Sequence, residues 1–438
     1  MSRIATDAGA GNADGVTTWK PATLVAFRFV FLYVVLWSLA NQVVAGMFLT
    51  PVGQLPPLGP EWPMRAITGV LGELFTGHEV RFEGGNSGDT LFHWVQTSWL
   101  LALSLFGTLV WSAADRGRTN YAELHKWFRL FLRFALCAQM FYYGMAKVIP
   151  TQFVPPALTV IVQPIGNLSL SNLLWAFVGA SVPYQVFGGV AEVVGAVLLV
   201  FPRTTPLGAL VTLADMVQVL ALNAGYDFGL KQISSHYILM SLLVLAPDAR
   251  RLLDVLVLDR PAPPSTHRPL ASRPDRARVV LVAQVLFGAY LFGVYTWLQV
   301  RQWEQPDGPA HPRSALYGIW DVERMTVDGE ERHPATNDYD RRWRRAIFDF
   351  PDRMVFQRFD DSMARYDSII DVNRGTLLLR KGTTGMWATT FEFERPAEDR
   401  LVLNGVMDGH AIHAELSLVG RDTWRLVNSP FRWVRPPE

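Results

Sequence analysis

The 438-residue sequence contains a single cysteine, Cys137, so no second thiol exists for an internal disulfide. It also lacks a C-x-x-C pair, a Gly-rich dinucleotide fingerprint and the cysteine spacings that hold iron–sulfur clusters or attached haem. Thiol redox chemistry within one chain is therefore excluded. Any redox chemistry would need a bound quinone or a partner redox subunit. No sequence motif identifies a cofactor, and a quinone is the candidate cofactor.

Charged residues are also scarce. Only 18% of the residues are charged and 50% are hydrophobic, while the formal net charge is +1. This balance gives no indication of a nucleic-acid partner. Apolar runs fill the chain up to residue 304, and a polar, alternating pattern begins near residue 316. We therefore expect a helical membrane domain over 21–304, a linker over 305–315 and a soluble domain over 316–438.

Seven apolar segments are long enough to cross a bilayer, which takes roughly 20 residues of helix. They are 24–48, 95–113, 128–149, 184–201, 206–224, 228–246 and 279–300. With the N-terminus inside, thirteen lysines and arginines fall on the cytoplasmic side and three on the other. This predicts a multi-pass protein of the inner or plasma membrane with an extracytoplasmic C-terminal domain. Residues 1–20 would form a disordered cytoplasmic N-terminus, and the Pro- and Arg-rich loop 258–278 would also lie inside.

The C-terminal domain has the pattern of antiparallel strands. About nine segments alternate hydrophobic and polar residues, from YGIWDVERMTV to TWRLVNS, with tight turns such as Asp328-Gly329 between them. This pattern predicts an all-β barrel or sandwich. The G-x-W motif of Gly318 and Trp320 resembles a lipocalin-like barrel, which either encloses a small apolar ligand or is filled by side chains. His410 and His413 are three residues apart on a strand and point to opposite faces, so we expect no metal site.

Ionisable side chains inside apolar segments are costly, and each needs a partner or a role. At 1.5 Å per residue, Lys147, Glu192, Asp215 and His236 all fall between the outer interface and the midplane. We expect Lys147 to pair with Glu192, and Asp215 with His236. These four are the candidate catalytic residues, and the candidate ligand pocket adds Tyr143, Gly144 and Asn223. Two interpretations are compatible with these residues. They form either a structural network or a polar pocket, and such a pocket would relay a proton or bind a quinone or lipid headgroup.

Two stretches, YGMAKVIPTQF and FGGVAEVVGAVLLVFPRTTPLGALV, are similar to the DoxX-like membrane family, over about residues 126–257. The matching positions are Gly144, Lys147, Glu192, Gly195, Leu198, Leu199 and Arg203. The resemblance implies a four-helix core and an association with a membrane thiosulfate:quinone oxidoreductase or with oxidative-stress complexes. The earlier spans resemble, more loosely, the HTTM and vitamin-K-dependent carboxylase group.

Three functions are compatible with these features. The first is a DoxX-like redox-associated membrane subunit that binds a quinone or lipid in a polar pocket near the outer leaflet. The second is a non-enzymatic protein that binds or transports a lipophilic ligand. The third is a carboxylase-like membrane enzyme acting on a quinone or lipid, with Lys147, Glu192 or His236 in acid–base roles. The sequence leaves open whether the protein is an enzyme.

Overall fold

The computed structural model describes residues 18–50, 53, 55–84, 88–263, 270–271, 273–305, 313–335, 342–381, 387–428 and 433–434. The chain divides into two compact units, Met1–Ile149 with Val186–Val300 and Pro150–Gln185 with Arg301–Glu438. Most of the expected N-terminal segment 1–20 and of the linker 305–315 lies outside the described residues, as does the middle of loop 258–278.

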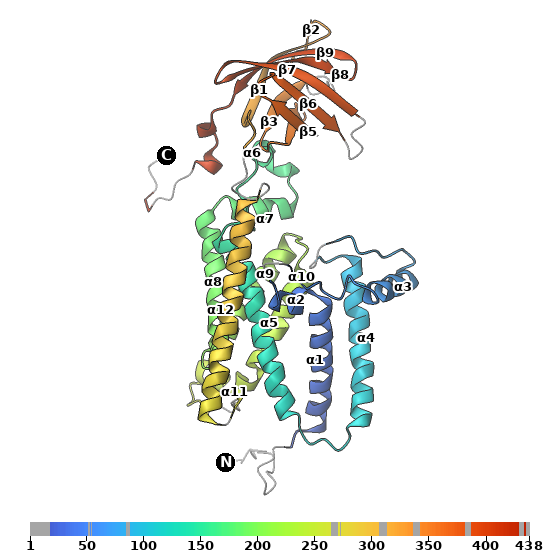
Figure 1. The fold of residues 1–438 in the computed structure, drawn as a ribbon, viewed down its shortest axis with the longest axis vertical. Coiled ribbons are helices and arrows are strands. Elements are labelled where there is room, and N and C mark those ends of the chain that lie inside the picture. Colours follow the sequence, from blue (N-terminus) through green and yellow to red (C-terminus); the bar gives the residue numbers. More distant parts are fainter. Residues whose placement is uncertain are drawn as a thin grey trace. The chain divides into compact units, whose positions relative to one another are not determined.

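The first unit is helical (Figure 1). Its helices are α1 (Pro21–Ala40), α2 (Gln42–Met47), α3 (Met64–Thr76), α4 (Leu91–Ala114), α5 (Ala122–Val148), α8 (Val182–Val200), α9 (Thr205–Gly225), α10 (Lys231–Leu245), α11 (Ala249–Leu256) and α12 (Pro274–Glu304). Proline occupies the first turn of α1 and of α9. An N–H group at this position has no acceptor within the helix, so the helix loses no hydrogen bond to proline.

Five of these helices are long and apolar enough to cross a membrane, namely α1, α4, α8, α9 and α12. They coincide with five of the seven segments expected from the sequence. The other two segments also form helices, but α5 contains several charged residues and α10 has only 15 residues. The helical character of the N-terminal part is therefore as predicted, whereas the count of seven spans is not confirmed.

The helix α5 lies at the centre of the helical unit. Its residues 134–141 are all buried, so the helix is enclosed on every side along this stretch. A helix surrounded by protein in this way needs no continuous lipid-facing surface. Arg133 and Gln139, the charged and amide residues at this part of α5, are buried and therefore face other helices.

The second unit contains a closed antiparallel barrel. Its strands are β1 (Gly318–Val327), β2 (Glu330–Glu331), β3 (Trp343–Phe348), β4 (Arg353–Arg358), β5 (Met363–Asp371), β6 (Thr376–Lys381), β7 (Trp387–Ala397), β8 (Arg400–Met407) and β9 (His410–Leu418). The strand β1 pairs with β3, and each strand from β3 to β8 pairs with the next. The strand β9 returns to pair with β1, which closes eight strands, while β2 forms a short hairpin with β1. Before the barrel come α6 (Leu158–Val162) and α7 (Leu170–Gly179).

Large side chains fill the barrel interior. Trp320, Phe348, Phe356 and Phe391 are fully buried in one apolar cluster with the alternate residues of the other strands. The Trp320 indole donates to the Leu316 carbonyl over 2.9 Å. Of the two uses expected for a lipocalin-like barrel, these buried side chains fit the packed interior.

The hairpin turns follow the sequence signals. Asp328-Gly329 and Asp408-Gly409 both have positive φ at their two residues, with values of 53°, 80°, 52° and 84°. This is the turn type that joins twisted antiparallel strands, and it favours Asp or Asn followed by Gly. Gly318 has φ 148°, and a Cβ there would lie 2.4 Å from Leu418 Cδ1, so only glycine fits at this point of barrel closure.

Two expectations for the second unit need correction. The segment TWRLVNS is not a ninth strand, because it forms two short 3-10 turns at Arg421–Thr423 and Arg425–Val427. Once β9 pairs with β1, the described barrel has no free edge at that point for another strand to join. The segment Pro150–Gln185 groups with the barrel and not with the helical unit, since Leu158 and Val162 pack on the outside of the barrel against Ile319, Ile347 and Val355.

Candidate functional site

The backbones of α5 and α8 approach closely at Gly144 and Gly189. A Cβ atom added to Gly189 would lie 2.7 Å from the Gly144 carbonyl oxygen and 2.9 Å from the Val148 nitrogen. A Cβ added to Gly144 would lie 3.0 Å from the Gly189 carbonyl oxygen. These distances leave no room for a side chain, so both positions require glycine. The two helices are close enough here for short contacts between the side chains that follow.

Lys147 and Glu192 form an ion pair across this contact. Lys147 Nζ donates to Glu192 Oε1 over 2.7 Å. Glu192 is only 1% exposed, so its negative charge depends on this lysine for compensation. The Lys147 ammonium group also lies 5.8 Å from the centre of the Tyr143 ring. The pairing predicted from helix depth is confirmed, and Tyr143 and Gly144 lie beside it.

Asp215, on α9, is the third member of this group. Its carboxyl group lies close to the Glu192 carboxyl group. The oxygens Glu192 Oε2 and Asp215 Oδ2 are buried, and no described residue donates to either. Two carboxyl groups this close repel each other when both are ionised. The Lys147–Glu192–Asp215 cluster therefore combines one cation and two carboxyl groups.

His236 is not the partner of Asp215, and that expectation is wrong. Its Nε2 is 2.6 Å from the Tyr33 hydroxyl, and its Nδ1 is 2.7 Å from the Gln232 carbonyl oxygen. The imidazole ring stacks flat on Trp37, with ring centres 3.8 Å apart. Both ring nitrogens are thus occupied by α1 and by its own helix. The sequence did not reveal which face of α10 carries His236.

A second buried polar network adjoins the cluster through Tyr143. The Gln42 amide donates to Gln139 Oε1 over 3.0 Å and to the Tyr143 hydroxyl over 2.8 Å. The Tyr237 hydroxyl donates to the same Gln139 oxygen over 2.7 Å. Sequence reasoning missed this network, although Gln42 and Gln139 both interrupt long apolar runs. Amides in such runs are a signal comparable to buried charges.

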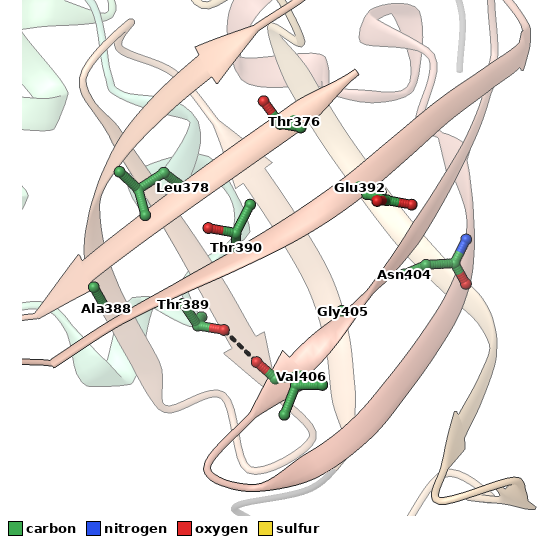
Figure 2. Close-up of a pocket in the computed structure, with 9 residues that line it drawn as sticks. All are labelled: Thr376, Leu378, Ala388, Thr389, Thr390, Glu392, Asn404, Gly405 and Val406. Atoms are coloured by element: carbon green, nitrogen blue, oxygen red, sulfur yellow. Dashed lines mark hydrogen bonds between the residues drawn. The ribbon is translucent and has the colours of Figure 1, made fainter. Parts of the chain in front are cut away.

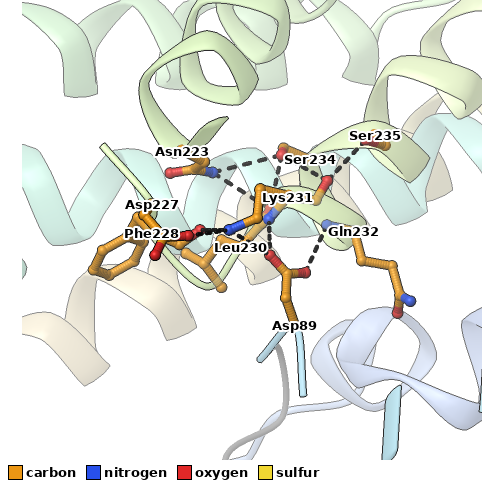
Figure 3. Close-up of polar contacts among 9 residues, drawn as sticks. All are labelled: Asp89, Asn223, Asp227, Phe228, Leu230, Lys231, Gln232, Ser234 and Ser235. Atoms are coloured by element: carbon orange, nitrogen blue, oxygen red, sulfur yellow. Dashed lines mark hydrogen bonds and ion pairs between the residues drawn. The ribbon is translucent and has the colours of Figure 1, made fainter. Parts of the chain in front are cut away.

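Asn223, expected in the ligand pocket, instead holds the hairpin between α9 and α10. Its amide donates to the Leu230 carbonyl over 3.3 Å and lies 3.5 Å from the Ser234 hydroxyl (Figure 3). An Asp227–Lys231 ion pair at 3.2 Å also lies at this hairpin. These contacts stabilise the turn between α9 and α10. Among the described residues, no contact links Asn223 to the Lys147–Glu192–Asp215 cluster.

Asp89 caps the same hairpin from a distant segment. Its two carboxylate oxygens accept hydrogen bonds from the backbone N–H groups of Lys231 and Gln232, over 2.8 and 2.9 Å (Figure 3). These are the first N–H groups of α10, which no helical carbonyl can satisfy. The loop before α4 is thereby tied to α10. A sequence motif could not reveal this cap, because the capping residue lies more than 140 positions away.

The two histidines of β9 bind different partners. His410 Nδ1 lies 2.6 Å from Asp328, and His413 Nδ1 lies 2.6 Å from Asn404. Within the part of the chain that the structure describes, no group of three or more His, Cys, Asp or Glu side chains is arranged to hold a metal ion.

A shallow depression of about 690 Å³ lies on the outer surface of the barrel, over β6, β7 and β8 (Figure 2). Thr376, Glu392 and Asn404 stand in one row across these strands, because Thr376 pairs with Glu392 and Glu392 with Asn404. His413 continues the row on β9. The four residues of this polar row are exposed or partly exposed, so the row does not indicate a particular ligand.

No family model matches the chain, and no solved structure matches it. The chain is 34% identical over 128 residues to "Uncharacterized protein YwoB" of Bacillus subtilis (strain 168). The matching stretch covers 29% of this chain and 79% of that protein. The relative's description names no activity, so the match adds no function to the geometry. At this identity and coverage, the chain belongs to the same family as YwoB.

Proposed function

We propose that this protein is a DoxX-like multi-pass membrane protein that binds a quinone or another lipophilic molecule at the Lys147–Glu192–Asp215 cluster. The observation that carries the proposal is the pair of buried carboxyl oxygens, on Glu192 and Asp215, that receive no hydrogen bond from a described residue. A buried polar group without a partner is costly, so a donor supplied by a ligand would be favourable. The resemblance of this region to the DoxX-like family supports the same reading.

The cluster suits the head of a quinone because it offers both hydrogen-bond donors and hydrogen-bond acceptors. A protonated carboxyl or the Lys147 ammonium donates to a carbonyl oxygen, and an ionised carboxyl accepts from a hydroxyl. Reduction of a quinone to a quinol consumes two electrons and two protons. The chain has no redox motif of its own, so the electrons would come from a partner redox subunit. One proton would come from a protonated carboxyl of the cluster and the other from the Lys147 ammonium group, and water would return both protons to these side chains.

Two members of the cluster, Asp215 on α9 and Lys147 on α5, are partly exposed, whereas Glu192 is fully buried. An apolar molecule dissolved in the bilayer would therefore reach Glu192 by way of Asp215 or Lys147. This arrangement favours a ligand that enters from the lipid side over a water-soluble one.

Bound small molecules identified by mass spectrometry after mild detergent purification test this proposal. We expect the wild-type protein to retain a quinone or lipid, and Asp215→Asn to retain much less. Asp227→Asn is the matched control, since it removes an exposed carboxylate from the turn that follows the same helix. Recovery of a non-redox lipid would favour the binding or transport function instead. Equal retention by wild type and Asp215→Asn would refute the site.

The membrane arrangement is part of the proposal. Seven spans result if α5 and α10 also cross, and the enclosed position of α5 removes the need for an apolar surface. The asymmetry of lysine and arginine then places the N-terminus in the cytoplasm and the barrel outside. The single cysteine makes this testable, because Cys137 is buried and gives little labelling background.

A membrane-impermeant maleimide on intact cells decides the orientation. We expect a cysteine at Val372, which is 61% exposed in the β5–β6 turn, to be labelled without permeabilisation. A cysteine at Thr119, exposed between α4 and α5, should be labelled only after permeabilisation. The reverse pattern would place the barrel in the cytoplasm.

A further inference from the structure

A cavity of about 880 Å³ opens at one end of the helical unit, away from the Lys147–Glu192–Asp215 cluster. The first half of α5, the loop between α8 and α9, and the start of α12 form most of its wall. Lys147 and Arg129 both lie on α5, and their positions are about 27 Å apart at 1.5 Å per residue. This cavity is therefore a separate site and needs its own explanation.

The lining divides into an apolar part and a cationic part. Leu130, Val280 and Leu281 contribute apolar surface. The cationic residues of the lining are Lys126, Arg129, Arg133 and Arg203. The first three follow one another at spacings of three and four on α5, so they project from one face of that helix. An apolar cavity with converging cations has the composition of a site for an amphiphile with an anionic head.

The carboxylates near this cavity do not balance its positive charge. Asp248 is shared, since it accepts from Arg129 over 2.9 Å and from Arg251 over 2.8 Å. Lys126 pairs with the exposed Glu123. Arg203 is exposed at the cavity rim and has no recorded ion pair among the described residues.

Arg133 adds a buried positive charge to the same cavity. It is 6% exposed, and its guanidinium donates to uncharged oxygens on Leu199, Val200 and Gln284. These bonds cap the carboxyl end of α8 and occupy four of the five N–H donors of the guanidinium. They do not neutralise it, because carbonyl oxygens carry no net charge. A cation held in this way favours an anion in the space beside it.

We propose that this cavity binds one anionic phospholipid, with its phosphate at Arg129 and Arg203 and an acyl chain along Leu130 and Leu281. Arginine suits a phosphate because its planar fork of donors matches two phosphate oxygens. The charge asymmetry of the sequence assigns this end to the cytoplasmic side, where anionic lipids are concentrated. The bound lipid would supply the negative charge that the protein lacks here.

Native mass spectrometry of the full chain in detergent tests the headgroup. The probes are dioleoyl phosphatidylglycerol and dioleoyl phosphatidylcholine, which share chains and phosphate but differ in net charge. We expect tighter binding of phosphatidylglycerol, and about tenfold weaker binding by Arg203→Gln, as for loss of one charge-assisted hydrogen bond. Arg276→Gln is the control, because it removes an exposed charge from the first turn of α12 without touching the lining.

Two further measurements separate a lipid from a free anion. Leu281→Trp fills the apolar part without changing charge, so it should weaken phosphatidylglycerol binding as strongly as Arg203→Gln does. Inorganic phosphate should not displace the lipid at equal concentration. The assignment is overturned if phosphatidylcholine binds equally well, if Arg276→Gln weakens binding as much as Arg203→Gln, or if phosphate competes.

Discussion

Replacing Gly189 by alanine should separate α5 from α8, and its neighbour Gly188 provides the control. A Cβ at Gly189 would meet the Gly144 carbonyl oxygen and Lys147 Cβ, both at 2.7 Å. A Cβ at Gly188 would meet nothing within 4 Å. Both substitutions gain about 0.8–1.0 kcal/mol of helix propensity, so this gain cancels in the comparison. What remains is the cost of the clash.

The size of that cost follows from the atoms involved. Overpacking costs about 1–3 kcal/mol, and here one contacting atom is backbone, so the helices must move apart. For a domain of roughly 150–250 residues, 1 kcal/mol corresponds to about 2–4 °C in Tm. We therefore expect Gly189→Ala to melt about 2–12 °C below Gly188→Ala.

Thermal unfolding of both variants in the same detergent, followed by near-ultraviolet circular dichroism, measures this difference. Gly188→Ala should equal or exceed the wild type in Tm, since it gains propensity without a clash. If Gly189→Ala melts at or above the Tm of Gly188→Ala, the close approach of the two helices is wrong. The geometry of the Lys147–Glu192 pair would then be in doubt as well.

Three other substitutions test separate contacts. Lys147→Met should cost about 3–5 kcal/mol because it leaves a buried carboxylate unpaired, and adding Glu192→Met should recover most of the loss in chemical unfolding. Tyr33→Phe should cost about 1–3 kcal/mol by leaving His236 Nε2 without its partner, and an unchanged His236 imidazole NMR signal would contradict the contact. Asp89→Ala should cost about 0.5–2 kcal/mol and speed hydrogen exchange in the first turn of α10, while Asp89→Asn keeps most of the cap.

The sequence was most informative where a local pattern determines the outcome. Long apolar runs located the helices, and alternation with Asp-Gly turns located eight barrel strands. Helix depth also predicted the Lys147–Glu192 pair, because rise per residue depends little on tertiary context. The prediction of a strand at TWRLVNS was wrong. Its alternating pattern resembles that of a strand, but the edge of β1 that it could have paired with is already paired with β9.

Rotation and long-range placement were decided only by the folded chain. Which face of a helix meets which neighbour depends on packing, so Asp215 turned out to lie beside Glu192 and His236 beside Tyr33 and Trp37. The role of Gly144 and Gly189 was likewise visible only in the folded chain, because a missing Cβ matters only when another backbone comes close.

The sequence by itself determined the two-part division, the apolar helices and the hairpins of the barrel, since each depends on residues near one another in the chain. The tertiary structure decided the closure of the barrel, the cap on α10 by Asp89 and the packing of residues 150–185 with the barrel. These features join segments far apart in sequence. No local periodicity encodes such contacts, because they form only when the separate elements have packed.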